Sequence, residues 1–284
     1  MEIKKVCVVG AGLMGKQIAL NTAKYGYDVY LTDSSSKALE AASKWSEEYL
    51  AERLKKGKMT EDEAAAIKSS FHLEPDLKEA AKNSQLVIEA IIEDKDIKEK
   101  LFSQLNDIIS EDAIIATNSS YMVSSTFKDA VKNPSRLANL HYFNPALVMK
   151  LTEVVQGEHT DDQTIEALMD FSRKTGKEPI WVRKEIDGFI VNRILRAVAN
   201  EALSLLENGI ATAQEIDMAA EKGLNYPMGP FRLQDFTGVD LAYLAAKKTL
   251  EETGFKKPGY ELLQEKYEKG EYGKKSGKGW YDYK

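Results

Sequence analysis

The chain has little cysteine and no long apolar run, and each absence excludes a class of protein. Cys7 is the only cysteine among 284 residues, so no disulfide within the chain stabilises the fold. Its place inside a predicted core strand indicates a buried, unreactive thiol. The sequence lacks the roughly 18 consecutive apolar residues of a membrane helix, and the early apolar run Val6–Val9 is too short for a signal peptide. We therefore expect a cytoplasmic protein that does not span a membrane.

Basic residues are not in excess either. The 39 lysines and arginines are outnumbered by 45 acidic residues, which gives a net charge of −6 at pH 7. Proteins that bind nucleic acid rely on a basic surface, so we predict no nucleic-acid partner. With 43% hydrophobic and 30% charged residues, the composition is typical of a soluble globular protein, and the length is sufficient for two domains.

Short apolar runs rich in valine and isoleucine alternate with helical patterns in the first part of the chain. This alternation is typical of a parallel sheet covered by helices on both faces. The predicted strands are Lys4–Val9, Asp28–Asp33, Gln85–Ile91, Ala113–Thr117, Leu137–Phe143, Leu151–Gln156 and Pro179–Val182. The charged, alanine-rich stretch 36–70 contains the capping-box pattern Thr60-Glu61-Asp62-Glu63. We expect it to form a helical pair inserted into the sheet domain.

Beyond about Glu185 the strand-like runs stop. Segments such as Phe189–Glu207 and Leu241–Thr253 carry apolar residues at helical spacing, with glycine or proline between them. The sequence therefore predicts an α/β domain with a mostly parallel sheet over residues 1–184, followed by an all-α domain over residues 185–284.

A glycine-rich turn, Gly10-Ala11-Gly12-Leu13-Met14-Gly15, follows the first predicted strand and opens a helix that ends near Gly26. In this context the first glycine permits a tight turn, the second lets the backbone approach a pyrophosphate, and the third lets helix and strand pack closely. The helix N-terminus adds unpaired N–H groups and partial positive charge. The turn therefore predicts a dinucleotide site that includes Gly10, Gly12, Leu13, Met14 and Gly15.

Asp33 ends the second predicted strand, about 20 residues beyond the turn, where a carboxylate can accept hydrogen bonds from the adenosine ribose. A 2′-phosphate at this place would be repelled, so the residue favours NAD over NADP. Alternatively, Asp33 caps the helix that begins in Ser34–Ser36.

His141 stands out among the three histidines of the chain because it lies near the end of an apolar strand, at the sheet edge where open α/β folds bind ligands. With an unperturbed pKa of about 6.5, histidine suits proton transfer to and from an alcohol near neutrality. Glu153 lies in an otherwise apolar strand, where an unpaired charge is costly. Pairing with His141 would remove that cost and orient the imidazole. The alternatives are a structural histidine and a salt bridge from Glu153 to a lysine.

Two further polar groups are candidates for the same site. Asn118-Ser119-Ser120 follows a predicted strand, so its side chains should emerge at the same sheet edge, although turn formation alone would also explain them. Asn192 lies on an apolar helix face, where an amide needs a partner in a site or in a buried polar network. We predict no metal site.

Taken together, these motifs resemble the L-3-hydroxyacyl-CoA dehydrogenase family, especially its short bacterial members, the 3-hydroxybutyryl-CoA dehydrogenases. The blocks that carry the resemblance are Gly10–Gly15, Val87–Glu93, His141–Pro145, Val148–Val154, Gly188–Arg193, Tyr226–Phe231 and Gly273–Gly277. The resemblance implies a Rossmann-like NAD-binding domain and a helical C-terminal domain that makes most of the contact in a homodimer.

The resemblance also implies residue roles. His141 would be the general base, Glu153 its orienting partner, and Ser120 and Asn192 the groups that bind the C3 oxygen of the substrate. Positions near the cofactor would be Glu93, Lys98, Asn118, Asn144 and Lys275. The family's usual Asn-Thr-Ser-Ser-Leu reads Asn118-Ser119-Ser120-Tyr121-Met122 here, so Ser119 stays an alternative to Ser120. Among Lys55, Lys56 and Lys58 of the inserted helical pair, Lys56 is the best match to the family's contact with the CoA phosphates, and a solvated helix end is the alternative.

The implied activity is reversible oxidation of a (3S)-3-hydroxyacyl-CoA, with a short acyl chain, to the 3-ketoacyl-CoA by NAD. A related carnitine or sugar-acid dehydrogenase is one alternative, but such enzymes typically have His-Pro where this chain has His141-Tyr142. A non-catalytic NAD-binding module is another, and it would need no general base.

Overall fold

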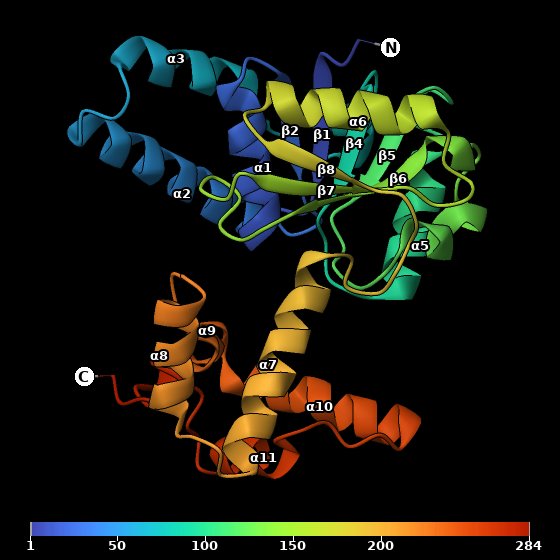
Figure 1. Cartoon of the computed structure of the whole chain (residues 1–284). Helices are drawn as coiled ribbons and strands as arrows, with labels where there is room; N and C mark the ends of the chain where they lie inside the picture. The colour runs from blue at the N-terminus through green and yellow to red at the C-terminus, as the bar shows by residue number, and fades with distance from the viewer. Residues whose placement is uncertain (1, 284) are drawn as a thin grey trace. The chain divides into compact units, whose positions relative to one another are not determined.

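The computed structural model describes residues 2–283 and contains two compact units, the first ending at Phe189 and the second beginning at Ile190 (Figure 1). The domain boundary predicted from the sequence, after residue 184, lies a few residues before this division. Among residues 2–283, no helix is both long and apolar enough to cross a membrane.

An eight-stranded sheet with the order β3-β2-β1-β4-β5-β6-β7-β8 organises the first unit. Its strands are β1 (Lys5–Val9), β2 (Asp28–Thr32), β3 (Phe71–Leu73), β4 (Leu86–Glu89), β5 (Ile114–Thr117), β6 (Leu137–Tyr142), β7 (Leu151–Val155) and β8 (Glu178–Val182). Every neighbouring pair is parallel except β6 and β7, which run antiparallel. The predicted mostly parallel sheet is confirmed. Strand β3 was not predicted, because three residues directly after a helix are too few to show a period.

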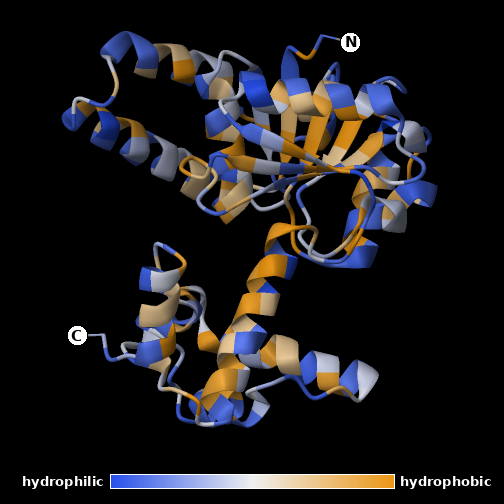
Figure 2. Cartoon of the chain, viewed as in Figure 1, coloured by the Kyte–Doolittle hydropathy of each residue, from blue (hydrophilic) through white to orange (hydrophobic). Residues whose placement is uncertain are grey.

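Helices cover both faces of this sheet. They are α1 (Leu13–Lys24), α2 (Ser36–Lys55), α3 (Glu61–Ser70), α4 (Leu77–Ala81), α5 (Lys95–Leu105) and α6 (Asp162–Lys174), with the 3₁₀ helices η1 (Ser124–Ala130) and η2 (Pro134–Arg136). Successive side chains of a strand point to opposite faces. Accordingly, Val8 packs in one core with Phe171 of α6, and Cys7 packs in another with Phe102 of α5. Figure 1 shows α5 and α6 on opposite sides of the sheet, and Figure 2 shows its strands as predominantly hydrophobic.

The inserted helical pair is formed by α2 and α3, and both begin as their sequences indicate. The side chain of Ser35 accepts a hydrogen bond from the backbone N–H of Ala38 at the start of α2. At the start of α3, Thr60 and Glu63 exchange both bonds of a capping box, which confirms the predicted motif. Cys7 is fully buried, and burial raises the pKa of its thiol to about 12, so it is a core residue.

The second unit is helical. It contains α7 (Val191–Glu207), α8 (Ala213–Gly223), α9 (Pro230–Thr237), α10 (Val239–Thr253), α11 (Tyr260–Glu268) and the 3₁₀ helix η3 (Lys274–Ser276). Its core includes Leu203, Phe231 and Leu263. The buried carboxylate of Asp235 accepts hydrogen bonds from the backbone N–H groups of Trp280 and Tyr281, which ties the C-terminal segment to α9. The predicted all-α architecture of this part is confirmed.

Candidate active site

A pocket of about 890 Å³ opens in the first unit at the carboxyl ends of β1, β2, β4 and β5. The strand order reverses between β1 and β4, and open α/β sheets bind ligands at such a switch point. Residues predicted for the cofactor that line this pocket are Gly10, Gly12, Leu13, Met14, Asp33, Glu93, Lys98 and Asn118. Ser119 and Ser120 line it as well.

The glycine turn is shaped as a dinucleotide site requires. Gly10 has a φ of +107°, a conformation that L side chains rarely adopt, and a Cβ there would lie 2.5 Å from the carbonyl oxygen of Ala90. A Cβ on Gly15 would lie only 1.7 Å from the carbonyl oxygen of Gly10. Gly12 is the N-cap of α1, and a Cβ on it would meet no described atom within 4 Å. The helix N-terminus therefore faces open space, and these residues fit the pyrophosphate of NAD.

Gly15 and Gly12 differ in the space available for a side chain, and this difference can be tested. Gly15→Ala places a methyl group against backbone that cannot move aside. Such overpacking costs about 1–3 kcal/mol, which for a domain of this size corresponds to a Tm about 2–12 °C lower. Gly12→Ala is the matched control, and its Tm should equal that of the wild type. Equal Tm values for both variants in thermal unfolding would contradict the close helix–strand contact.

Asp33 does not cap the following helix, because the N-cap of α2 is Ser35, and its carboxylate binds two backbone N–H groups beside the pocket instead. Its Oδ2 accepts a hydrogen bond from the backbone N–H of Ala11 at 2.7 Å, and its Oδ1 accepts one from the backbone N–H of Ser35 at 2.8 Å. The carboxylate thus holds the glycine turn and the start of α2 together. Each carboxylate oxygen can accept more than one hydrogen bond, so capacity for ribose hydroxyls is left.

The antiparallel register of β6 and β7 places His141 directly opposite Glu153. His141 Nδ1 lies 2.8 Å from Glu153 Oε2, and His141 Nε2 lies 2.9 Å from Ser120 Oγ. Both members of the His–Glu pair are buried, and the rings of Phe143 and Phe189 contact the imidazole with centroids 4.7 and 5.4 Å away. With the Nδ1 proton donated to the carboxylate, the lone pair of Nε2 is available to accept a proton.

The structure brings Ser120, and not Ser119, to the imidazole. Ser119 Oγ donates to Glu93 Oε1 at 2.7 Å and accepts from the backbone N–H of Met122 at 2.8 Å. These bonds shape the loop after β5 so that the next residue reaches His141. Glu93 also accepts from the backbone N–H of Ser120 at 3.1 Å.

Sequence reasoning missed one residue of this site, Glu89, the last residue of β4. Its carboxylate is buried beneath the pocket, 2.7 Å from Lys98 Nζ and 2.6 Å from Thr117 Oγ1. Its sequence pattern could have identified it, because a carboxylate at the end of the apolar run Val87-Ile88-Glu89 resembles Glu153 within Leu151–Val155.

The other candidate residues lie in several places. Asn118 Oδ1 accepts from the backbone N–H of Tyr142 at 2.9 Å, which ties β5 to β6, and Asn144 Oδ1 lies 3.4 Å from the amide nitrogen of Gln17 in α1. Lys56 is the exposed C-cap of α2 and pairs with Glu52.

Asn192 and Lys275 belong to the second unit. Asn192 lies in the first turn of α7, where its carbonyl accepts from Arg196 Nε at 3.3 Å. Lys275 Nζ lies 2.7 Å from Asp240 Oδ2. Their roles, like those of Lys56 and Asn144, stay predictions.

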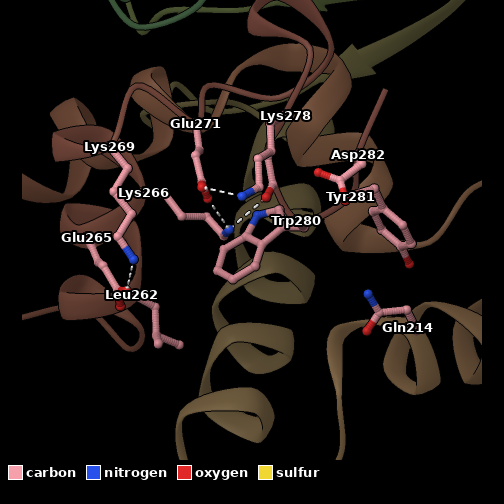
Figure 3. Close-up of a pocket in the computed structure, with 11 residues that line it drawn as sticks. Gln214, Leu262, Glu265, Lys266, Lys269, Glu271, Lys278, Trp280, Tyr281 and Asp282 are labelled. Carbon is pink, nitrogen blue, oxygen red and sulfur yellow. Dashed lines mark hydrogen bonds and ion pairs between the residues drawn. The ribbon is translucent and has the colours of Figure 1, made fainter. Parts of the chain in front are cut away.

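A second pocket, of about 530 Å³, lies entirely within the second unit (Figure 3). Lys266 and Lys278 both pair with Glu271, at 3.1 and 2.8 Å, and Lys269 pairs with Glu265. Because each of these ammonium groups already has a carboxylate partner, we assign no ligand to this pocket. Among residues 2–283, no group of three or more His, Cys, Asp or Glu side chains is placed to hold a metal ion.

Comparison with known proteins identifies one family over nearly the whole chain. Residues 5–186 match the NAD binding domain of 3-hydroxyacyl-CoA dehydrogenase, and residues 188–283 match its C-terminal domain. A probable 3-hydroxybutyryl-CoA dehydrogenase of Bacillus subtilis is 36% identical over 100% of this chain and 98% of its own length. The human mitochondrial hydroxyacyl-coenzyme A dehydrogenase is 37% identical over 99% of this chain and 92% of its own length. The crystal structure of (S)-3-hydroxybutyryl-CoA dehydrogenase from Ralstonia eutropha covers 100% of both chains, with 34% identity and a TM-score of 0.91. The chain therefore belongs to the 3-hydroxyacyl-CoA dehydrogenase family.

Proposed function

We propose that this protein reversibly oxidises (3S)-3-hydroxyacyl-CoA to 3-ketoacyl-CoA with NAD. The observation that carries the proposal is the hydrogen-bonded series Ser120–His141–Glu153, whose serine lines the pocket of the glycine turn. Since relatives in Bacillus and Ralstonia are named for 3-hydroxybutyryl-CoA, we propose a short-chain substrate of this kind.

In the proposed reaction His141 Nε2 accepts the proton of the C3 hydroxyl during oxidation and returns it during reduction. Glu153 keeps the imidazole in the required tautomer and stabilises the imidazolium that forms. Ser120 hydrogen-bonds the C3 oxygen and thereby orients it toward His141. NAD, when bound by the glycine turn and Asp33, supplies the hydride acceptor.

Two partner assignments complete the proposal. Lys56, exposed at the end of α2, binds a phosphate of CoA.

The second unit forms a homodimer, which is supported by the large apolar side chains that it exposes. Examples are Ile194 at 59%, Phe236 at 63% and Leu241 at 57% exposure. We also propose a cytoplasmic location.

The most direct test is the absorbance of reduced nicotinamide after the protein is mixed with acetoacetyl-CoA and NADH. A steady decrease that depends on both compounds is expected. If the absorbance decreased with dehydrocarnitine or a keto sugar acid but not with acetoacetyl-CoA, the protein would be a carnitine or sugar-acid dehydrogenase, and the proposed substrate would be wrong. No decrease with any of them would indicate a binding module.

The preference for NAD over NADP is expected to depend on Asp33. A carboxylate repels the 2′-phosphate of NADP, so the wild type should show a kcat/KM at least about tenfold higher with NAD, which corresponds to about 1.4 kcal/mol. Asp33→Ser should reduce this ratio to near one. Asp28→Ser, at the start of β2, is the control and should leave the ratio unchanged, because Asp33 directly follows the other end of that strand. A ratio unaffected by Asp33→Ser would remove this residue from cofactor selection.

A further inference from the structure

Glu89 is a buried carboxylate to which the proposed reaction gives no role. The residue has no exposed surface. Its Oε1 accepts hydrogen bonds from the backbone N–H of Ile91 at 2.8 Å and from Lys98 Nζ at 2.7 Å. Its Oε2 accepts one from Thr117 Oγ1 at 2.6 Å. A buried charge is tolerated when it is paired and hydrogen-bonded, and these contacts from β5 and α5 fix the Glu89 carboxylate in one position.

Lys98 lies between two carboxylates. It is 1% exposed, and its Nζ lies 2.7 Å from Glu89 Oε1 and 3.1 Å from Glu93 Oε2. The side chain of Glu93 is 42% exposed and lines the cofactor pocket. Because Glu89 is fully buried and Glu93 is partly exposed, we take Glu89 to set the position of the Lys98 ammonium, and Lys98 in turn to restrain Glu93.

Glu93 divides its two oxygens between this ammonium and the loop that carries Ser120. While Oε2 contacts Lys98, Oε1 accepts from Ser119 Oγ at 2.7 Å and from the backbone N–H of Ser120 at 3.1 Å. Ser120 Oγ then lies 2.9 Å from His141 Nε2. A continuous series of polar contacts thus runs from Glu89 to the imidazole.

We propose that Glu89 is a positioning residue that acts through Lys98 and Glu93 to hold Ser120 against His141. The proposal rests on the function proposed above, since it assigns Ser120 to the substrate's C3 oxygen. When Glu89 carries no charge, Glu93 is the one charged carboxylate of this series that still pairs with the buried ammonium of Lys98. The stronger attraction between them draws Glu93 away from the backbone N–H of Ser120, and the loop loses the contact that orders it.

The kinetic test uses Glu89→Gln, which keeps the size of the side chain and removes its charge. Misplacement of a substrate-binding group by a fraction of an ångström is expected to lower kcat about ten- to hundredfold, with KM for acetoacetyl-CoA changed much less. The same substitution is then made in a Ser120→Ala protein, where it should change kcat less than about twofold, because its effect passes through Ser120. An unchanged kcat in folded Glu89→Gln, or an equal loss in both backgrounds, would overturn the proposal.

A spectroscopic measurement tests the positioning without requiring turnover. The chain has only three histidines, so ¹⁵N-histidine labelling gives three imidazoles, and His141→Gln identifies the signal of interest. Glu89→Gln should shift the Nε2 signal of His141 in the same direction as Ser120→Ala does. An Nε2 signal that moves in Ser120→Ala but not in Glu89→Gln would overturn the proposal.

Glu185→Gln is the matched control. The carboxylate of Glu185 accepts from Ser124 Oγ at 2.7 Å and from the backbone N–H of Ser125 at 2.8 Å, which repeats the contacts of Glu93 a few residues further along the chain. Ser124 Oγ also lies 3.4 Å from His159 Nε2, so this variant should shift the signal of His159 and leave that of His141 in place. A wild-type protein that turns over no 3-ketoacyl-CoA would refute the proposed function alone, since the imidazole signals would still report the positioning.

Discussion

Replacing His141 with glutamine is expected to lower kcat with acetoacetyl-CoA about 10²- to 10⁴-fold, the range that general acid–base catalysis contributes. A glutamine amide can keep a hydrogen bond to Ser120, but it cannot accept or return the proton of the C3 hydroxyl. The Kd of NADH should change less than about threefold, because the imidazole is not among the residues that line the pocket of the glycine turn. Steady-state kinetics and a fluorescence titration with NADH measure the two quantities.

The chain offers a matched control for this substitution. His72 of β3 also pairs with a carboxylate of the neighbouring strand, with Nε2 2.9 Å from Asp28 Oδ1. His72→Gln removes an exposed His–carboxylate contact from the same sheet and should leave kcat within about twofold. If His141→Gln reduced turnover no more than His72→Gln does, His141 would not be the general base.

Glu153→Gln is expected to produce the second large effect, a fall in kcat of about 10²-fold or more. The side chain is fully buried, so water cannot replace the lost carboxylate. A neutral amide cannot stabilise the imidazolium that forms when His141 accepts a proton, and its N–H groups can favour the wrong tautomer of the ring. Since Glu153 does not line the cofactor pocket, the Kd of NADH should be nearly unchanged.

The control for this variant is Glu178→Gln on the adjacent strand β8. Glu178 is exposed, with Lys150 Nζ 3.7 Å away, and such exposed pairs contribute little. Both variants should have the same secondary structure by circular dichroism, and only Glu153→Gln should lose turnover. Equal kcat values for Glu153→Gln and Glu178→Gln would mean that Glu153 has only a structural role in the sheet.

The elements of the fold were predictable where a period is long enough to recognise. The strands β1, β4 and β5 are almost continuous apolar runs because both faces of the sheet are covered there. The N-terminal cap of α3 is recognisable from Thr60 and Glu63. Strand β3 has only three half-buried residues. Its strand conformation comes from pairing with β2, which no local pattern encodes.

The residues of the candidate site were likewise predictable only where a local pattern identifies them. The glycine turn and Asp33 were predictable because the residues act within one βαβ unit, in a local context that the sequence contains. His141 and Glu153 were predictable as a pair because a buried carboxylate needs a partner and the strands are close in sequence. Ser120 was preferred to Ser119 only through the family resemblance, since both follow the same strand and both are serine.

Local patterns thus sufficed to predict the architecture, the glycine turn and the pairing of His141 with Glu153, because periodicity and the cost of buried charge are properties of short segments. Such patterns do not show that Ser120 contacts the imidazole, or that Glu89, Lys98 and Glu93 connect β4 and α5 to that serine. The reason is that hydrogen bonds depend on distances of about 3 Å between side chains of different elements. Those distances arise only when the strand ends are brought together at one edge of the sheet.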